Sequence, residues 1–592
     1  MNTSLYLLII QILKKHHMRK LFITSILLLF TIVSIAQKTK KDTLKTEEIT
    51  VVKPYTPTIS EAFKVKSNPT INDQNFQKET VNYSIFSVPV ASTFTPSKGK
   101  AQGLKRAPKE RLYENYVSAG FGNYTTPLFE AFLHSGDKRY NDYGVFLKYQ
   151  SSQGGIKDVL LDDNYSDIQV DLFYKQFERD FDWKINAGYN RELYNYYGLP
   201  TSITFDDNVL DNIDEKQVYN SIYLGGSINF EDAIFNSGTI EIINFFDAYN
   251  SNELRFLAKP TFEFPLSTEA IHAEVLVDYI NGKFDQSYAS SNELTYSFLN
   301  LGVTPNFEIL KDDLSINLGV KLYYTFDLEN SSNQFKAYPN VTASYKVVND
   351  IFILTAGVTG DLIQNSYRNF TQENPFVSPT LNIQQTDQQY NAFIGAKGKL
   401  ASNIGYNVNV NYMNEKDKAL FTQNQTLTDG TILAINAYEA GNSFKVVYDD
   451  VSTINASAEV NVEVSKEFQL NVGLNYSNYT ITNELEAWNL PEFTARLSAA
   501  YKTEKWHVGT LLFFRGTTKD FVISYGDLPV NGSIVKNESY VDLNFNGGYI
   551  FSDRLSVFGK INNAVSKSYE RFVNYPVQSI QLLAGVTYKF DL

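Results

Sequence analysis

The sequence contains no cysteine, and this absence excludes several classes of protein. Without thiols there is no disulfide framework, no thiolate metal site and no lipid-modified amino-terminal cysteine, so the chain is not a lipoprotein. Histidine is nearly as scarce, because the chain has only five. Three of them, His134, His272 and His507, are too scattered to suggest a zinc or haem site. We therefore expect no cofactor, no metal centre and no catalytic constellation, and the protein is not expected to be an enzyme.

Long apolar runs are also missing after residue 36. A membrane-spanning helix needs roughly 20 mostly apolar residues, and the best segments available resemble 351–358. Gly-rich phosphate loops and basic aromatic platforms are absent as well, so binding of nucleotides or nucleic acids has no support. If the chain crosses a membrane, it must do so with strands.

The amino terminus carries an export signal. Met18 begins a short basic stretch, residues 21–33 are almost unbroken apolar sequence, and Ser34-Ile35-Ala36 offers small residues for signal peptidase. Residues 1–36 are predicted to be a signal peptide cleaved after Ala36, with Met18 as the true start. A double-hydrophobic membrane anchor is the alternative.

Residues 37–112 have a different composition from the rest. They hold 14 Lys and Arg against 7 Asp and Glu, together with several prolines and no sustained periodicity. Such a segment is typical of an extended tail, here predicted to lie in the periplasm. Removing its +7 and the +4 of residues 1–36 from the total of -13 leaves -24 for residues 113–592.

From Tyr113 onward, apolar and polar residues alternate strictly. In 403–412, Ile, Tyr and Val interleave with Asn and Gly, which predicts a strand with one apolar and one amide face. Similar segments, including 403–414, 452–464 and 579–591, number about 22. Residues 113–592 are therefore predicted to form an all-β, transmembrane antiparallel barrel in the outer membrane, in contact with its lipid.

The links between these segments separate into two classes. When the predicted strands are counted from Tyr113, the links after even-numbered strands are short. Many links after odd-numbered strands are long, namely 192–216, 362–386, 415–451 and 516–538. Outer-membrane barrels have short periplasmic turns and long external loops, so both chain ends are expected in the periplasm. A soluble β-sandwich or propeller would also alternate, but this segregation of links favours the membrane.

The final strand carries a second argument for a barrel. Its apolar face includes Val586, Tyr588 and Phe590, and the chain ends two residues later. Because the last strand must pair with the first to remove both sheet edges, we expect these residues to act as the signal read by the barrel-assembly machinery.

Four short stretches resemble the barrel of TonB-dependent receptors. They are Tyr448 to Val451, Tyr540 to Phe551, Ile561 to Asn563 followed by Tyr569, and Gly585 to Phe590. The resemblance covers residues 113–592 and implies a 22-stranded barrel that serves transport, with external loops that meet the ligand.

A TonB-box-like segment lies near the amino terminus. Glu47, Glu48, Ile49, Thr50, Val51 and Val52 are similar to the short run that, in this family, adds a strand to the periplasmic protein TonB. The alternative is a disordered linker. TonB, or another periplasmic or outer-membrane protein, is thus a candidate partner.

The chain departs from the family in one respect. A TonB-dependent receptor folds a plug of over a hundred residues inside its barrel, and only residues 53–112 are available here. This shortage of residues predicts a receptor-like barrel without a plug. The alternatives to a role in transport are a structural subunit that scaffolds an outer-membrane complex and a passive pore.

Charge suggests what could occupy the lumen. Glu459, Glu463 and Asp542 are predicted to face it, and the tail is basic, so part of residues 53–112 is expected inside the barrel. The alternative is a tail that trails freely in the periplasm. A separate acidic stretch, Asp206, Asp207, Asp211, Asp214 and Glu215, falls in an external loop. It lacks EF-hand spacing, which favours a solvated loop over a calcium site.

Overall fold

The computed structural model describes residues 113–591 except 138, 232, 267–268, 289, 433–435, 528–530 and 567. The predicted signal peptide, the basic tail, the TonB-box-like segment and any plug lie outside the described residues. Within them, no helix is both long enough and apolar enough to cross a membrane.

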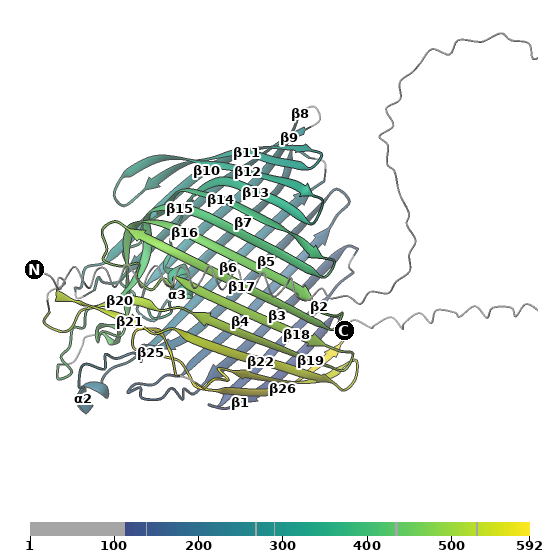
Figure 1. Ribbon diagram of the computed structural model, residues 1–592. Helices are drawn as coiled ribbons and strands as arrows, with labels where there is room; N and C mark the ends of the chain where they lie inside the picture. The colour runs from purple at the N-terminus through teal and green to yellow at the C-terminus, as the bar shows by residue number, and fades with distance from the viewer. Residues whose placement is uncertain are drawn as a thin grey trace, which may run out of the picture. The chain divides into compact units, whose positions relative to one another are not determined.

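Twenty-two strands form one closed antiparallel sheet (Figure 1). The sheet closes because β1 pairs with β26, with Asn115 opposite Phe590 and Gly122 opposite Leu583. The strands are β1 (Asn115–Gly122), β2 (Thr126–Ser135), β3 (Asn141–Ser152), β4 (Tyr165–Phe177), β5 (Phe181–Asn195), β6 (Lys216–Phe230), β7 (Phe235–Phe246), β8 (Asn252–Leu266), β9 (Glu269–Phe284), β10 (Leu294–Lys311), β11 (Leu314–Asp327), β12 (Ser332–Val348), β13 (Phe352–Ile363), β14 (Thr386–Ala401), β15 (Ile404–Gln423), β16 (Phe444–Glu463), β17 (Phe468–Ile481), β18 (Phe493–Lys502), β19 (Trp506–Arg515), β22 (Tyr540–Ile550), β23 (Leu555–Asn562) and β26 (Gln581–Phe590).

The predicted number of barrel strands is confirmed, but some links were predicted too long. The link 415–451 shrinks to 424–443, because β15 and β16 continue pairing up to Gln423 and Phe444. Two small hairpins lie within other long links and were not predicted. They are β20 (Thr518–Val522) with β21 (Ser533–Asn537), and β24 (Glu570–Phe572) with β25 (Tyr575–Pro576).

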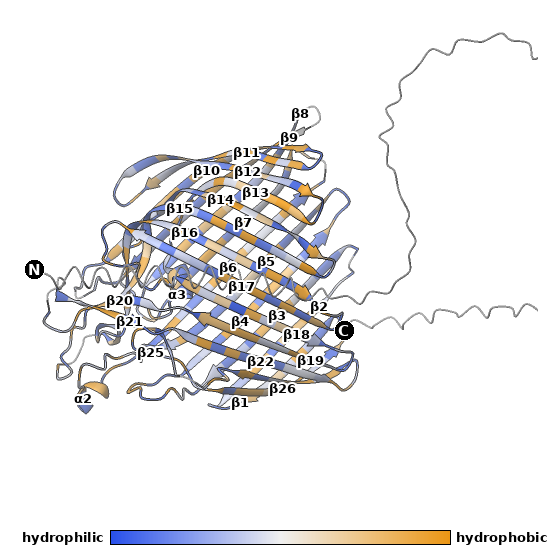
Figure 2. Ribbon diagram, viewed as in Figure 1, coloured by the Kyte–Doolittle hydropathy of each residue, from blue (hydrophilic) through white to orange (hydrophobic). Residues whose placement is uncertain are grey.

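Alternation divides each strand between two surfaces (Figure 2). On β15, Val408 and Val410 are 43% and 45% exposed on the outer face, although they are apolar. The alternate residues Asn407, Asn409 and Asn411 take the opposite face, where they lie across from Glu459, Ser457 and Asn455 of β16. Apolar side chains left exposed all around a closed sheet are what a lipid-facing barrel surface requires.

The links also segregate as predicted. Those that follow even-numbered strands are short, such as 402–403 and 503–505, whereas the longest ones are 196–215, 364–385, 424–443 and 516–539. In Figure 1, helices α2 (Asp207–Leu210) and α3 (Tyr367–Glu373) and the hairpin β20–β21 gather at one end of the barrel, opposite the carboxyl terminus.

Single cysteines can establish which end faces the medium. Asp429, in a long link, and Ser465, in a short one, are both exposed. We expect Asp429→Cys to react with an impermeant maleimide on intact cells and Ser465→Cys to react only after lysis. The reverse pattern would place the long links in the periplasm.

Candidate functional site

One long link folds back into the mouth of the barrel. This cap loop, residues 364–385, contains α3 and joins a hydrophobic cluster built with inward-facing residues of the wall. The wall contributes from two separated groups of strands, so the loop spans the mouth between them. The cluster consists of Tyr219, Phe245, Ile280, Phe284, Tyr296 and Phe298 from β6 to β10, Phe421, Phe444 and Val446 from β15 and β16, Tyr367, Phe370, Val377, Leu381 and Ile383 from the cap loop, and Phe572 and Tyr575 from β24 and β25.

A glutamate of the wall holds the first turn of α3. The backbone N–H groups of Tyr367 and Arg368 donate to the two oxygens of Glu253, at 2.6 and 3.4 Å. The hydroxyl of Tyr296 donates to the same carboxylate at 2.5 Å. Because the first amides of a helix have no partner within it and carry partial positive charge, a carboxylate there is favoured. Ser366 supplies the usual side-chain cap, accepting from Asn369 N at 3.1 Å.

A second buried carboxylate holds the same helix from its side. Tyr367, only 1% exposed, donates its hydroxyl to Asp247 at 2.7 Å. Asp247 also accepts from the backbone of Tyr249 and Ser251, which shapes the link between β7 and β8. Since a buried carboxylate is costly unless it is fully hydrogen-bonded, both acids tie α3 to one position.

The two stems of the cap loop are held by the same arrangement of side chains. Before the loop, Asp361 accepts from Lys321 Nζ at 2.6 Å and from the Tyr323 hydroxyl at 2.8 Å. After the loop, Asp387 accepts from Lys336 Nζ at 2.7 Å and from the Tyr338 hydroxyl at 2.8 Å. The lysine and tyrosine are two residues apart on β11 and again on β12, so both point inward.

Two other links meet the cap loop through aromatic rings, and a third is joined to them by hydrogen bonds. Phe376 stacks on Tyr575 with ring centroids 3.7 Å apart, and Tyr197 packs edge-on against Tyr575 at 4.9 Å. The Tyr575 hydroxyl donates to the carbonyl of Asn442, and Asn442 Nδ2 donates to the carbonyl of Tyr196 at 2.6 Å. Residues 196–215, 364–385, 424–443 and 563–580 therefore form one packed layer, which we call the cap.

The β20–β21 hairpin is attached beside the cap by a fully buried carboxylate. Asp520 accepts from Gln423 N at 2.9 Å and from Asn489 Nδ2 at 2.6 Å. Burial raises the pKa of Asp520 to about 6, although these hydrogen bonds partly oppose the shift.

The raised pKa of Asp520 predicts a pH-dependent attachment of this hairpin. An acid whose folded-state pKa exceeds its unfolded value favours folding when protonated, so stability falls as pH rises from about 4 to about 6. The change is up to roughly 3 kcal/mol at about 1.4 kcal/mol per pKa unit. After correction for intrinsic rates, hydrogen exchange of residues 516–538 should be faster at pH 7 than at pH 4.5. In Asp520→Asn this difference should disappear, and its persistence would contradict the assignment.

The predicted assembly residues lie at the barrel seam. Val586 and Tyr588 are outward-facing and 44% and 45% exposed, opposite Ala119 and Val117 of β1. The Tyr588 and Phe590 rings stack with centroids 6.0 Å apart. The structure thus places the three residues on the strand that closes the sheet, and their role as a signal remains a prediction.

Other residues considered in the sequence do not gather into a site. His134 and His272 lie near Asp142 and Glu263, at 2.9 and 3.7 Å, on different strands from each other and from His507. Asp206, Asp207, Asp211 and Asp214 are exposed around the short α2. Among the described residues, no group of three or more His, Asp or Glu is arranged to hold a metal ion.

Sequence reasoning missed the cap entirely. It predicted the long links only as external loops that meet the ligand, and it did not predict that they pack together. Tyr367, Phe370 and Phe376 all occur within one long link. Aromatic density in a link was the available signal, since exposed loops rarely carry many large apolar rings.

Comparison with known proteins gives matches in structure alone. No family model and no curated protein matches the chain. Among solved structures, it is similar to the FrpB iron transporter from Neisseria meningitidis (F3-3 variant), with a TM-score of 0.60 and 10% identity over 81% of this chain and 82% of that one. The chain shares with this structure the fold of a large closed antiparallel β-barrel.

Two further structures have a comparable similarity. The pyoverdine outer membrane receptor FpvA from Pseudomonas aeruginosa PAO1, bound to pyoverdine, gives a TM-score of 0.58 and 14% identity over 81% of this chain and 79% of that one. A mutant of the ferric enterobactin receptor PfeA from Pseudomonas aeruginosa gives a TM-score of 0.57 and 12% identity over 80% of each chain. The sequence-based resemblance is thus supported at the level of the barrel fold.

Proposed function

We propose that this protein is an outer-membrane receptor-like barrel that takes part in transport, with the cap as the part that meets the ligand and controls the lumen. The observation that carries the proposal is the cap itself. A 22-stranded barrel leaves a wide lumen, and the cap loop spans its mouth on a hydrophobic cluster. An obstructed mouth is what a receptor needs if its lumen opens only during transport, whereas a passive pore needs an unobstructed path.

The arrangement of charges around the cap supports the same conclusion. Glu253 and Asp247 are buried beneath α3, with 2% and 8% exposure. Their contacts fix one position of the loop, because breaking them would leave uncompensated buried charge. A purely structural subunit has no evident need for a loop held inside its own lumen in this way.

Energy for opening would come from TonB through Glu47 to Val52, in line with the resemblance stated above. A photo-crosslinking amino acid at Ile49 should capture TonB in living cells, and one at Ile71 in the same tail should not. Replacement of Val51 by proline should abolish capture, because proline removes a backbone donor needed for strand addition. Absence of capture at Ile49 would leave transport without a TonB-driven step.

A further inference from the structure

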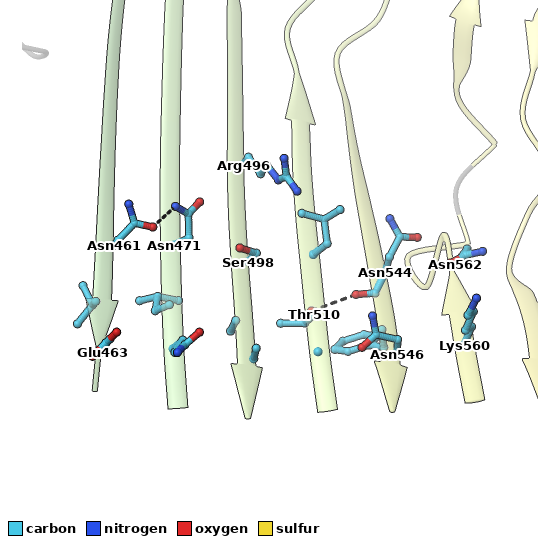
Figure 3. Close-up of a pocket in the computed structure, with 18 residues that line it drawn as sticks. Asn461, Glu463, Asn471, Arg496, Ser498, Thr510, Asn544, Asn546, Lys560 and Asn562 are labelled. Carbon is cyan, nitrogen blue, oxygen red and sulfur yellow. Dashed lines mark hydrogen bonds between the residues drawn. The ribbon is translucent and has the colours of Figure 1, made fainter. Parts of the chain in front are cut away.

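The wall of the lumen contains a polar hollow on the side of the short turns, away from the cap. It has a volume of about 720 Å³ and spreads over β16 to β23. Figure 3 shows the labelled side chains of this hollow on neighbouring strands, with Arg496 and Lys560 at different heights and on different strands. The volume lies within the range of ordinary small-molecule sites.

Strand register orders the hollow into rows. One row crosses five strands and is mostly amide and hydroxyl: Asn461, Asn471, Ser498, Leu511 and Asn544. Asn562 of β23 also lines the hollow. The row below that of Asn461 runs from Glu463 at one edge to Lys560 at the other. Its middle positions are Ala500 and Gly509, and the side-chain amide of Asn546 lies against Gly509.

The two cations of the hollow, Arg496 and Lys560, lack among the described residues the carboxylate partners that several inward-facing cations elsewhere in the wall have. Lys148, Arg255, Lys321, Lys336 and Lys418 each contact a carboxylate, at 2.5 to 2.7 Å. Arg496 makes no hydrogen bond or ion pair with any described residue, and Lys560 contacts only the face of the Phe558 ring, at 5.7 Å. Both side chains are exposed to the lumen. Their charge is therefore available to a ligand.

From this arrangement we infer that the hollow binds an elongated, hydroxyl-rich anion of the acidic oligosaccharide class. A side-chain amide both donates and accepts, and so matches sugar hydroxyls, while guanidinium and ammonium groups pair with carboxylates. Strand spacing of about 4.8 Å and a rise of about 3.4 Å per residue put the Cα atoms of Arg496 and Lys560 about 20 Å apart. A ligand that reaches both cations must be long and carry more than one charge.

The chain's own basic segment is a poorer match for this hollow. Residues 37–112 carry +7, and they would meet Arg496 and Lys560 as like charges. The inference concerns equilibrium binding, so it does not depend on coupling to TonB or on transport.

Titration calorimetry on the full chain in detergent would test the inference, with trigalacturonate as the probe and maltotriose as its uncharged counterpart. We expect trigalacturonate to bind at least tenfold more tightly than maltotriose. The double variant Arg496→Gln, Lys560→Gln should weaken trigalacturonate binding at least tenfold. Arg496→Lys keeps the charge but loses the two-pronged geometry, and should weaken binding by a few-fold.

Lys397→Gln is the matched control. Lys397 is an exposed cation on β14 with no ion pair among the described residues, and it faces the same lumen, because its partner Asn407 pairs with Glu459. This variant should bind within twofold of the unchanged protein. Equal weakening in Lys397→Gln, no effect of the double variant, or no binding of trigalacturonate by the unchanged protein would each overturn the inference. Heat-modifiable mobility on gels confirms that each variant is folded.

Discussion

Deleting residues 586–592 is expected to remove the protein from the outer membrane. The deletion eliminates the pairing of Val586 to Phe590 with Ala119 to Asn115, and also the contacts of Val586 to Tyr588 with Val557 to Leu555. Both β1 and β23 would then expose unpaired backbone groups. Each such group costs several kcal/mol in hydrocarbon, so the barrel cannot close within the bilayer.

The measurement is an immunoblot of outer-membrane and periplasmic fractions. We expect the truncated chain to be degraded and absent from the membrane fraction. Removal of Asp591 and Leu592 alone is the matched control, because both residues lie beyond the end of β26. Normal membrane levels of the longer deletion would show that the chain closes its barrel without this strand.

Replacing the cap loop by a short turn should convert the protein into an open pore. The variant joins Ile363 to Thr386 through Gly-Ser-Gly, which removes α3 and the central part of the hydrophobic cluster. The wall strands keep their ladders, so the barrel should still fold. Because the lumen of a barrel of this size is wide, conductance in planar bilayers should rise at least tenfold.

A turn on the same rim provides the control for this experiment. Residues 328–331 link β11 and β12, and replacing them with Asn-Gly should leave conductance unchanged. Cells that carry the cap-loop variant should also become sensitive to vancomycin, which is too large for ordinary porins. Unchanged conductance in a folded cap-loop variant would point to a second seal, for which residues 53–112 are the candidate predicted from their charge.

The lumen is less uniformly acidic than the net charge of residues 113–592 suggested. Glu459 and Asp542 do lie on the strand faces predicted for them, where they accept hydrogen bonds from Asn471 and Tyr569. Several other inward-facing carboxylates are paired with cations of the wall, as in the bidentate contact of Arg255 with Asp278 at 2.7 and 2.9 Å. Charge attraction between the tail and the lumen would therefore act at particular positions, and occupancy by residues 53–112 remains a prediction.

The barrel could be predicted from the amino-acid sequence alone. Strand side chains alternate with period two. The pattern of a run such as 403–414 therefore predicts that it is a strand and which residues lie on each of its faces, and no distant residue is needed for this prediction. The segregation of short and long links is equally readable, because it depends only on spacing along the chain. Pairing of the last strand with the first follows from the need to remove both edges.

The packing of the long links could not be predicted from the sequence and became visible in the folded chain. Phe376 meets Tyr575 and Glu253 meets Tyr367 across large separations in the chain, and no local pattern distinguishes these residues from others of the same type in an exposed loop. The same reason accounts for the misplaced ends of β15 and β16, which are extended by their partners rather than by their own alternation. The strands of the barrel wall can be predicted from local periodicity in the sequence, whereas the cap depends on contacts between residues that are far apart in the chain.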